Sequence, residues 1–211
     1  LLAYLFSFLG MIVIWGIGMA ISYPGNTTSD SNDIIYTALG INNMKSMVPV
    51  VYILFIRFFW NIGYAIFGNV NASLAVCTAM HVLVISSMIS YLVSRLYRYG
   101  VKKWICLSVW LFYAVVPYNI QLCHTIWKDI PFAAFVFFFS ILIWEQYEEN
   151  DTQSLLAESF RLLLLLISAM GICLMRNNGF FAYIFFMPFG IYLFYKKNKK
   201  VVITLLVAFV L

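Results

Sequence analysis

The chain has 211 residues, of which 64% are hydrophobic and only 10% are charged, and its mean hydropathy is +0.93. A soluble globular domain carries about a quarter charged residues. The composition therefore excludes a water-soluble protein and predicts an all-α integral membrane protein. The net charge is +5, but the basic residues gather in two short loops, where they are topology signals rather than a surface for nucleic acid.

Apolar segments predict six full membrane-spanning helices and a truncated seventh. They are 1–22, 72–94, 104–122, 131–147, 162–175 with its flanks, 180–195, and the incomplete 201–211. The chain begins inside one apolar run and stops inside another, which is shorter than the ~20 residues that a spanning helix needs. We therefore expect a fragment truncated at both ends, with a single transmembrane domain over 1–211.

Three polar segments interrupt this pattern, and we call them the first island (24–33), the second island (124–129) and the third island (176–179). Ionisable groups beside hydrocarbon are costly and are usually kept for function. Whether the islands share one side of the membrane depends on 49–69. That segment is long enough to cross, yet it contains Arg57 and Asn61.

Two basic loops, 95–103 and 196–200, are expected inside. If 49–69 lies on the membrane surface, all three islands fall outside. If it crosses, the first island lies on the opposite side from the other two. The positive-inside rule permits both arrangements. The polar load of 49–69 favours a surface helix, so we predict that 23–71 is an outer loop with juxtamembrane helices.

The first island predicts a turn at Pro24–Gly25 and then a short helix that ends at Gly40. Asp30 or Ser31 suits the N-cap, with Asp33 in the first turn, where a carboxylate is favourable. Alternatively, Asp30 is a general base that takes a proton from an acceptor hydroxyl, while Asp33 supports it or binds the acceptor. Two acids also suit a divalent metal, but no further ligand accompanies them, so no metal site is assigned.

The second island precedes a helix whose first turn contains Pro131, which makes Asp129 a candidate cap. His124 and Lys128 share one face if this stretch is helical. Lys128 is either an anchor that reaches the headgroups or a phosphate ligand, with His124 as a second donor. Trp127 is typical of an interfacial belt.

The third island reads as a helix stop, with Gly179 as the left-handed residue after Asn178. Arg176 either reaches the headgroups or, with the amides of Asn177 and Asn178, binds a pyrophosphate or a sugar. Arg57, in the middle of an apolar stretch, requires an anion or a carboxylate. Together, these cations, acids and amides suit transfer from a lipid phosphate donor to a hydroxyl.

Three short motifs follow one another along the chain: Pro24, Gly25 and Asp30; Trp127, Lys128, Asp129 and Phe132; Arg176, Asn177, Asn178 and Gly179. This series resembles the GT-C superfamily of multi-spanning glycosyltransferases. It is more closely similar to an uncharacterised bacterial family of GT-C-like membrane proteins. In that family histidines often precede the proline that matches Pro49, whereas Met47 and Val48 stand here.

The resemblance implies a GT-C-like helical bundle in a bacterial plasma membrane. It also implies a polyprenyl-phosphate-linked sugar donor, a glycan or lipid acceptor of the cell envelope, and Asp30 as the catalytic acid of the first outer loop. We therefore expect a glycosyltransferase that acts on the extracytoplasmic face. The alternatives are a transporter or flippase for a lipid-linked or anionic solute, which paired broken helices would favour, and an inactive scaffold subunit.

Overall fold

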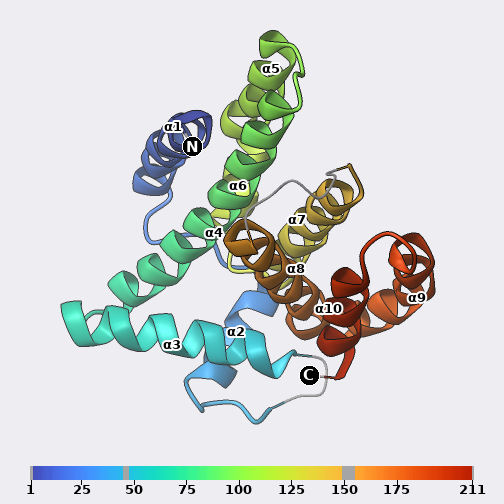
Figure 1. Ribbon diagram of the computed structural model, residues 1–211. Coiled ribbons are helices and arrows are strands. Elements are labelled where there is room, and N and C mark those ends of the chain that lie inside the picture. The colour runs from blue at the N-terminus through green and yellow to red at the C-terminus, as the bar shows by residue number, and fades with distance from the viewer. Residues whose placement is uncertain (1, 45–47, 149–154, 211) are drawn as a thin grey trace. The chain divides into compact units, whose positions relative to one another are not determined.

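The computed structural model describes residues 2–44, 48–148 and 155–210 (Figure 1). Within these ranges it contains ten helices: α1 (Leu2–Ile21), α2 (Ser29–Ala38), α3 (Val50–Phe67), α4 (Val70–Arg98), α5 (Lys103–Val115), α6 (Pro117–Cys123), α7 (Asp129–Glu148), α8 (Leu155–Met175), α9 (Asn177–Phe194) and α10 (Lys199–Val210). The chain divides into two compact units, which we call unit 1 (Leu1–Pro131) and unit 2 (Phe132–Leu211).

The expected all-α membrane protein is confirmed. Among the described residues, five helices are long and apolar enough to span a bilayer: α1, α3, α4, α7 and α8. The predicted span 104–122 is instead a pair, α5 and α6, bent by 59°. The bend falls at Val116–Pro117 because a residue before proline is restricted to extended backbone, and Val116 has φ −62° and ψ 119°. The predicted span 180–195 forms a helix, α9, but is not among the five.

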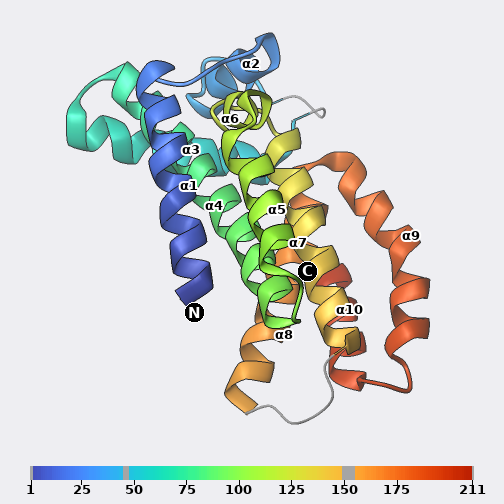
Figure 2. The same cartoon turned by 90° about the horizontal axis from the view of Figure 1, so that it is seen from above.

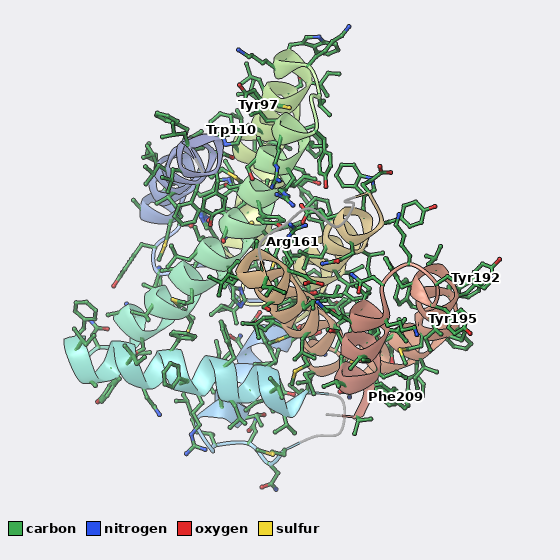
Figure 3. The ribbon with its side chains drawn as sticks, in the orientation of Figure 1. Tyr97, Trp110, Arg161, Tyr192, Tyr195 and Phe209 are labelled. Carbon is green, nitrogen blue, oxygen red and sulfur yellow. The ribbon has the colours of Figure 1, made fainter. Side chains whose placement is uncertain are left out.

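In unit 1, α1 is antiparallel to α4: Thr78, in the first third of α4, donates to the carbonyl of Pro24 just after α1, whereas the start of α1 bonds the later part of α4. Tyr4 bonds Ser87 at 2.8 Å and Ser7 bonds Ser90 at 3.2 Å. Trp110 of α5, labelled in Figure 3, donates to the carbonyl of Ser7 at 3.0 Å. The basic segment 95–103 therefore lies at the end of unit 1 that carries the N-terminus of α1.

The other end of unit 1 carries α2 and α3, away from the N-terminus (Figure 2). In both views α3 runs across the direction of α1 rather than alongside it. Its buried residues form one stripe at helical spacing, from Tyr52 through Ile56 and Trp60 to Gly63. Gly63 permits close packing on α4, because a Cβ there would lie 2.6 Å from Cα of Ser73.

Unit 2 consists of α8, α9, α10 and most of α7. Gly171 of α8 lies directly against the ring of Phe135 in α7, which lets these helices approach closely. Tyr183 of α9 donates to the carbonyl of Leu205 in α10 at 2.9 Å. Lys200 pairs with Glu158 at 2.7 Å. In Figure 3 the labelled Tyr192 and Tyr195 point outward from α9, and both are exposed.

Candidate functional site

The first island is organised by its own helix cap. Thr28, rather than Asp30 or Ser31, is the N-cap of α2. The backbone N–H of Ser31 donates to Oγ1 of Thr28 at 3.2 Å, and the backbone N–H of Thr28 donates to Oγ of Ser31 at 2.9 Å. This reciprocal pair is a capping box, so the expectation that Asp30 or Ser31 is the N-cap was wrong, although Ser31 takes part in the cap. Asp30 is thus spared from capping and stands exposed in the first turn.

Asp33, which we expected in the first turn, lies one turn further on and is half-buried. Its Oδ1 accepts a hydrogen bond from the side-chain amide of Asn42 at 3.0 Å. The helix ends at Ala38 and is followed by Gly40, whose φ is +76°. The expected short helix is confirmed, and its two acids differ in surroundings: Asp30 faces solvent or headgroups, whereas Asp33 has a fixed partner.

The first and second islands meet in a short parallel β-bridge between Asn26 and Thr125. The N–H of Asn26 donates to the carbonyl of His124 at 2.8 Å, and the N–H of Ile126 donates to the carbonyl of Asn26 at 3.1 Å. The segment after α6 is not helical, so the condition under which His124 and Lys128 would share a helix face is not met. The bridge supplies hydrogen-bond partners for backbone N–H and C=O groups that have none within a helix here.

Gly25 permits this bridge. Its φ is +128°, a region that side chains disfavour, and a Cβ there would collide with Oγ1 of Thr78 in α4. The same hydroxyl donates to the carbonyl of Pro24 at 3.2 Å. The Pro-Gly motif therefore serves a close approach between the first island, α4 and the second island.

His124 is buried, with 1% of its surface exposed, and both ring nitrogens have partners. Nε2 lies 3.0 Å from the carbonyl of Trp15. A carbonyl only accepts, so Nε2 carries a proton. Nδ1 lies 3.2 Å from the hydroxyl of Ser22, which itself donates to the carbonyl of Gly18 at 3.0 Å. Gly18 makes room for the ring, since a Cβ there would lie 2.9 Å from Cε1 of His124. His124 thus holds the second island against α1. Its role as a hydrogen-bond donor to a bound phosphate stays a prediction.

We expect His124 to make the stability of unit 1 depend on pH. Burial lowers the pKa of His124 below 6.5, and the carbonyl of Trp15 offsets part of the shift. The unfolded chain then binds the proton more readily, so stability is retained above a pH of about 6.5 and is lost below it. Thermal unfolding in detergent from about pH 8 to about pH 5 should show a steeper loss for the wild type than for His124→Gln. Parallel curves would contradict this role.

The charged residues of the second island flank the start of α7. Lys128 precedes this helix and Asp129 is its first residue; both are half-buried. Pro131 lies in the first turn as expected, with Asp129 beside it in that turn rather than at the cap. Arg57 is exposed on α3, on the side away from its buried stripe. Asp30, Asp33, Lys128, Asp129, His124 and Arg57 all belong to unit 1.

The third island belongs to unit 2, and the expectation for its glycine was wrong. Arg176 is the N-cap of α9, and its guanidinium carbon lies 5.6 Å from the ring centre of Phe132. Asn177 and Asn178 are exposed in the first turn. Gly179 is inside α9 and does not have the positive φ of a left-handed stop. A Cβ there would collide with the carbonyl of Ile172 in α8. Close packing of α9 on α8 therefore explains the glycine.

Two buried polar residues of unit 1, His81 and Tyr52, were not predicted from the sequence. His81 of α4 is 2% exposed. Its Nε2 lies 3.2 Å from the hydroxyl of Tyr52 in α3. Its Nδ1 makes no hydrogen bond of ordinary geometry, although the backbone of Thr125 lies beside the ring. A lone ionisable residue within an apolar span was the available signal. The His81–Tyr52 pair joins α3 to α4 beneath the second island.

No cluster of three or more potential metal ligands occurs among His, Cys, Asp and Glu of the described residues. The four cysteines are free, and three of them, Cys77, Cys106 and Cys123, are buried.

The family model for DUF6020, described as a family of unknown function, matches residues 44–211. The chain belongs to DUF6020. The match contains the second and third islands and α3 to α10, whereas the first island precedes it. No curated protein and no solved structure matches the chain. Membership of an uncharacterised family agrees with the expectation from the motifs.

Proposed function

We propose that this DUF6020 chain is a membrane glycosyltransferase of GT-C type. It moves a sugar from a polyprenyl-phosphate-linked donor to a cell-envelope acceptor on the extracytoplasmic face. Asp30 is the general base and Asp33 supports it or binds the acceptor. Lys128, Asp129 and Arg57, which all belong to unit 1, bind the donor.

The observation that carries the proposal is the bridge between Asn26 and Thr125. It joins the island that contains Asp30 to the island that contains Lys128. Both ends of the chain segment 26–125 must therefore lie on one side of the membrane. Between them are α3, α4 and the α5–α6 pair, of which an even number must cross.

The hydrogen bonds of α1 indicate which two of these three elements cross the membrane. Ser7, near the start of α1, bonds Ser90 near the end of α4. Trp15, further along α1, donates to the carbonyl of Ala114 at the end of α5, at 3.2 Å. Thus α4 leads away from the bridged islands and α5–α6 leads back. Two crossings are then complete, and α3 lies along the membrane surface.

This topology has a definite orientation. The residues Arg95, Arg98, Lys102 and Lys103 gather at the end opposite the bridge, and basic loops remain on the cytoplasmic side. The first two islands then face outward, where a lipid-linked donor presents its sugar. A carboxylate that accepts the acceptor's proton, with cations that stabilise the phosphate leaving group, provides general-base and electrostatic catalysis.

Cysteine labelling in intact cells tests the shared outer face. In a full-length protein without native cysteines, we expect a membrane-impermeant thiol reagent to label cysteine at Asn32, Gln121 and Asn178. Each of these positions is exposed. Cysteine at Lys102, which is exposed within the basic loop 95–103, is the control and should react only after the membrane is opened. Protection of Asn32→Cys alone would mean that α3 crosses, and Asp30 would then be excluded as the base.

The activity itself is tested by transfer of labelled sugar from a polyprenyl-phosphate donor to isolated envelope, with purified protein in vesicles. Transfer that requires Asp30 and no ion gradient supports the enzyme. Movement of the intact donor across the bilayer without cleavage would instead identify a flippase.

A further inference from the structure

Unit 2 contains an apolar groove of about 270 Å³ between three helices. It is lined chiefly by Val136, Phe139 and Ile143 of α7, Ile172 of α8, and Ala182 and Phe186 of α9. Two further lining residues carry hydroxyls, and both hydroxyls are already bonded. Ser140 donates to the carbonyl of Val136, and Tyr183 donates to the carbonyl of Leu205, each at 2.9 Å. A cavity with its polar groups satisfied suits hydrocarbon rather than water.

Arg176 does not line the groove, but it precedes the lining residues of α9, as Phe132 precedes those of α7. Arg176 precedes α9, and Ala182 follows it by six residues, or about 9 Å along a helix. The guanidinium of Arg176 lies over Phe132, one turn before Val136 on α7. Val136 and Ala182 on the rim are exposed. The positive charge of Arg176 is therefore expected about one to two helical turns beyond the groove, which is open along one side.

We propose that this groove binds one acyl chain of an anionic bilayer phospholipid whose phosphate contacts Arg176. A guanidinium fork suits a phosphate, and the bilayer around an integral membrane chain supplies the hydrocarbon. At about 30 Å³ for a group of water's size, 270 Å³ holds on the order of nine such groups, which matches part of one chain. A packed helix, about 10 Å across, is too wide. This site does not depend on the proposed transferase activity.

Photo-crosslinking of the full chain tests the site. The probe is phosphatidylglycerol with a diazirine in one acyl chain, diluted into phosphatidylcholine vesicles, and mass spectrometry locates the adducts. We expect adducts on peptides that contain 136–143 and 182–186. Ala182→Trp fills the groove and should reduce these adducts by roughly tenfold. Phe181→Trp is the matched control, because Phe181 is exposed outside the groove, and it should leave them unchanged.

The headgroup is tested separately. Arg176→Gln should weaken labelling by the anionic probe by roughly tenfold, the value of a charge-assisted hydrogen bond. Lys199→Gln removes an equal charge from the exposed start of α10 and should have no effect. Adducts spread equally over the exposed Phe185 and Phe189 would overturn the site. So would equal labelling in Arg176→Gln. Displacement of the probe by polyprenyl phosphate, but not by unlabelled phosphatidylglycerol, would reassign the groove to the donor and overturn the phospholipid.

Discussion

We expect Asp30→Asn to lower sugar transfer by about 10²–10⁴-fold, the usual contribution of a general base, while the protein still inserts and folds. The exchange keeps the shape of the side chain and removes only its ability to take a proton. Thr28 and Ser31 cap α2, so the loss of the carboxylate leaves the helix start intact. Transfer assays on equal amounts of purified wild type and variant check this result.

The small electrostatic role of Asp30 can be separated from catalysis. A carboxylate in the first turn stabilises a helix by about 0.3–1 kcal/mol. The double variant Asp30→Asn with Asn32→Asp returns one negative charge to this turn, at a different and also exposed position. We expect it to regain any lost thermal stability but no transfer. Recovery of transfer in the double variant, or full activity in Asp30→Asn, would refute the base.

The helices were largely predictable because a membrane span is a local, compositional signal. The predicted 1–22 and 131–147 agree with α1 and α7 within a few residues. The wrong expectations fall where a distant contact overrides a local pattern. Asn178–Gly179 has the sequence of a helix stop, yet Gly179 lies inside α9, and its glycine is explained by the carbonyl of Ile172, which leaves no room for a Cβ.

The candidate site shows the same limit. The positive-inside rule allowed the islands to share one side, and the polar residues of 49–69 favoured that arrangement. No local signal pairs Asn26 with Thr125, which lie 99 positions apart (125 − 26). Histidine is a residue type that often binds substrates, which made His124 a candidate site residue. Its burial against Trp15 and Ser22 instead depends on Gly18 in another helix. His81 went unrecognised because its partner, Tyr52, is on α3. Such pairings follow from the packing of helices rather than from spacing along one of them.

Gly25→Ala should separate the first two islands, because the bridge requires both the conformation and the small size of glycine. A residue other than glycine at φ +128° costs on the order of 1–3 kcal/mol. The new Cβ also collides with Thr78, and the carbonyl of His124 is only 3.2 Å away. Disulfide formation between Asn26→Cys and Thr125→Cys, in a protein without native cysteines, measures the bridge. Efficient cross-linking is expected when Gly25 is kept, and a large loss of cross-linking is expected in the Gly25→Ala variant.

Two further variants separate strain from collision. Gly40 also has a positive φ, +76°, but no atom lies within 4 Å of a Cβ there. Gly40→Ala therefore carries only strain, about 1–2 kcal/mol, and should leave the cross-link intact. Thr78→Ala removes the hydroxyl that the new Cβ meets, so Gly25→Ala with Thr78→Ala should recover part of the cross-link. If Gly25→Ala cross-links as well as the wild type, the bridge does not join the islands. The carboxylate of Asp30 would then have no structural reason to share a site with Lys128.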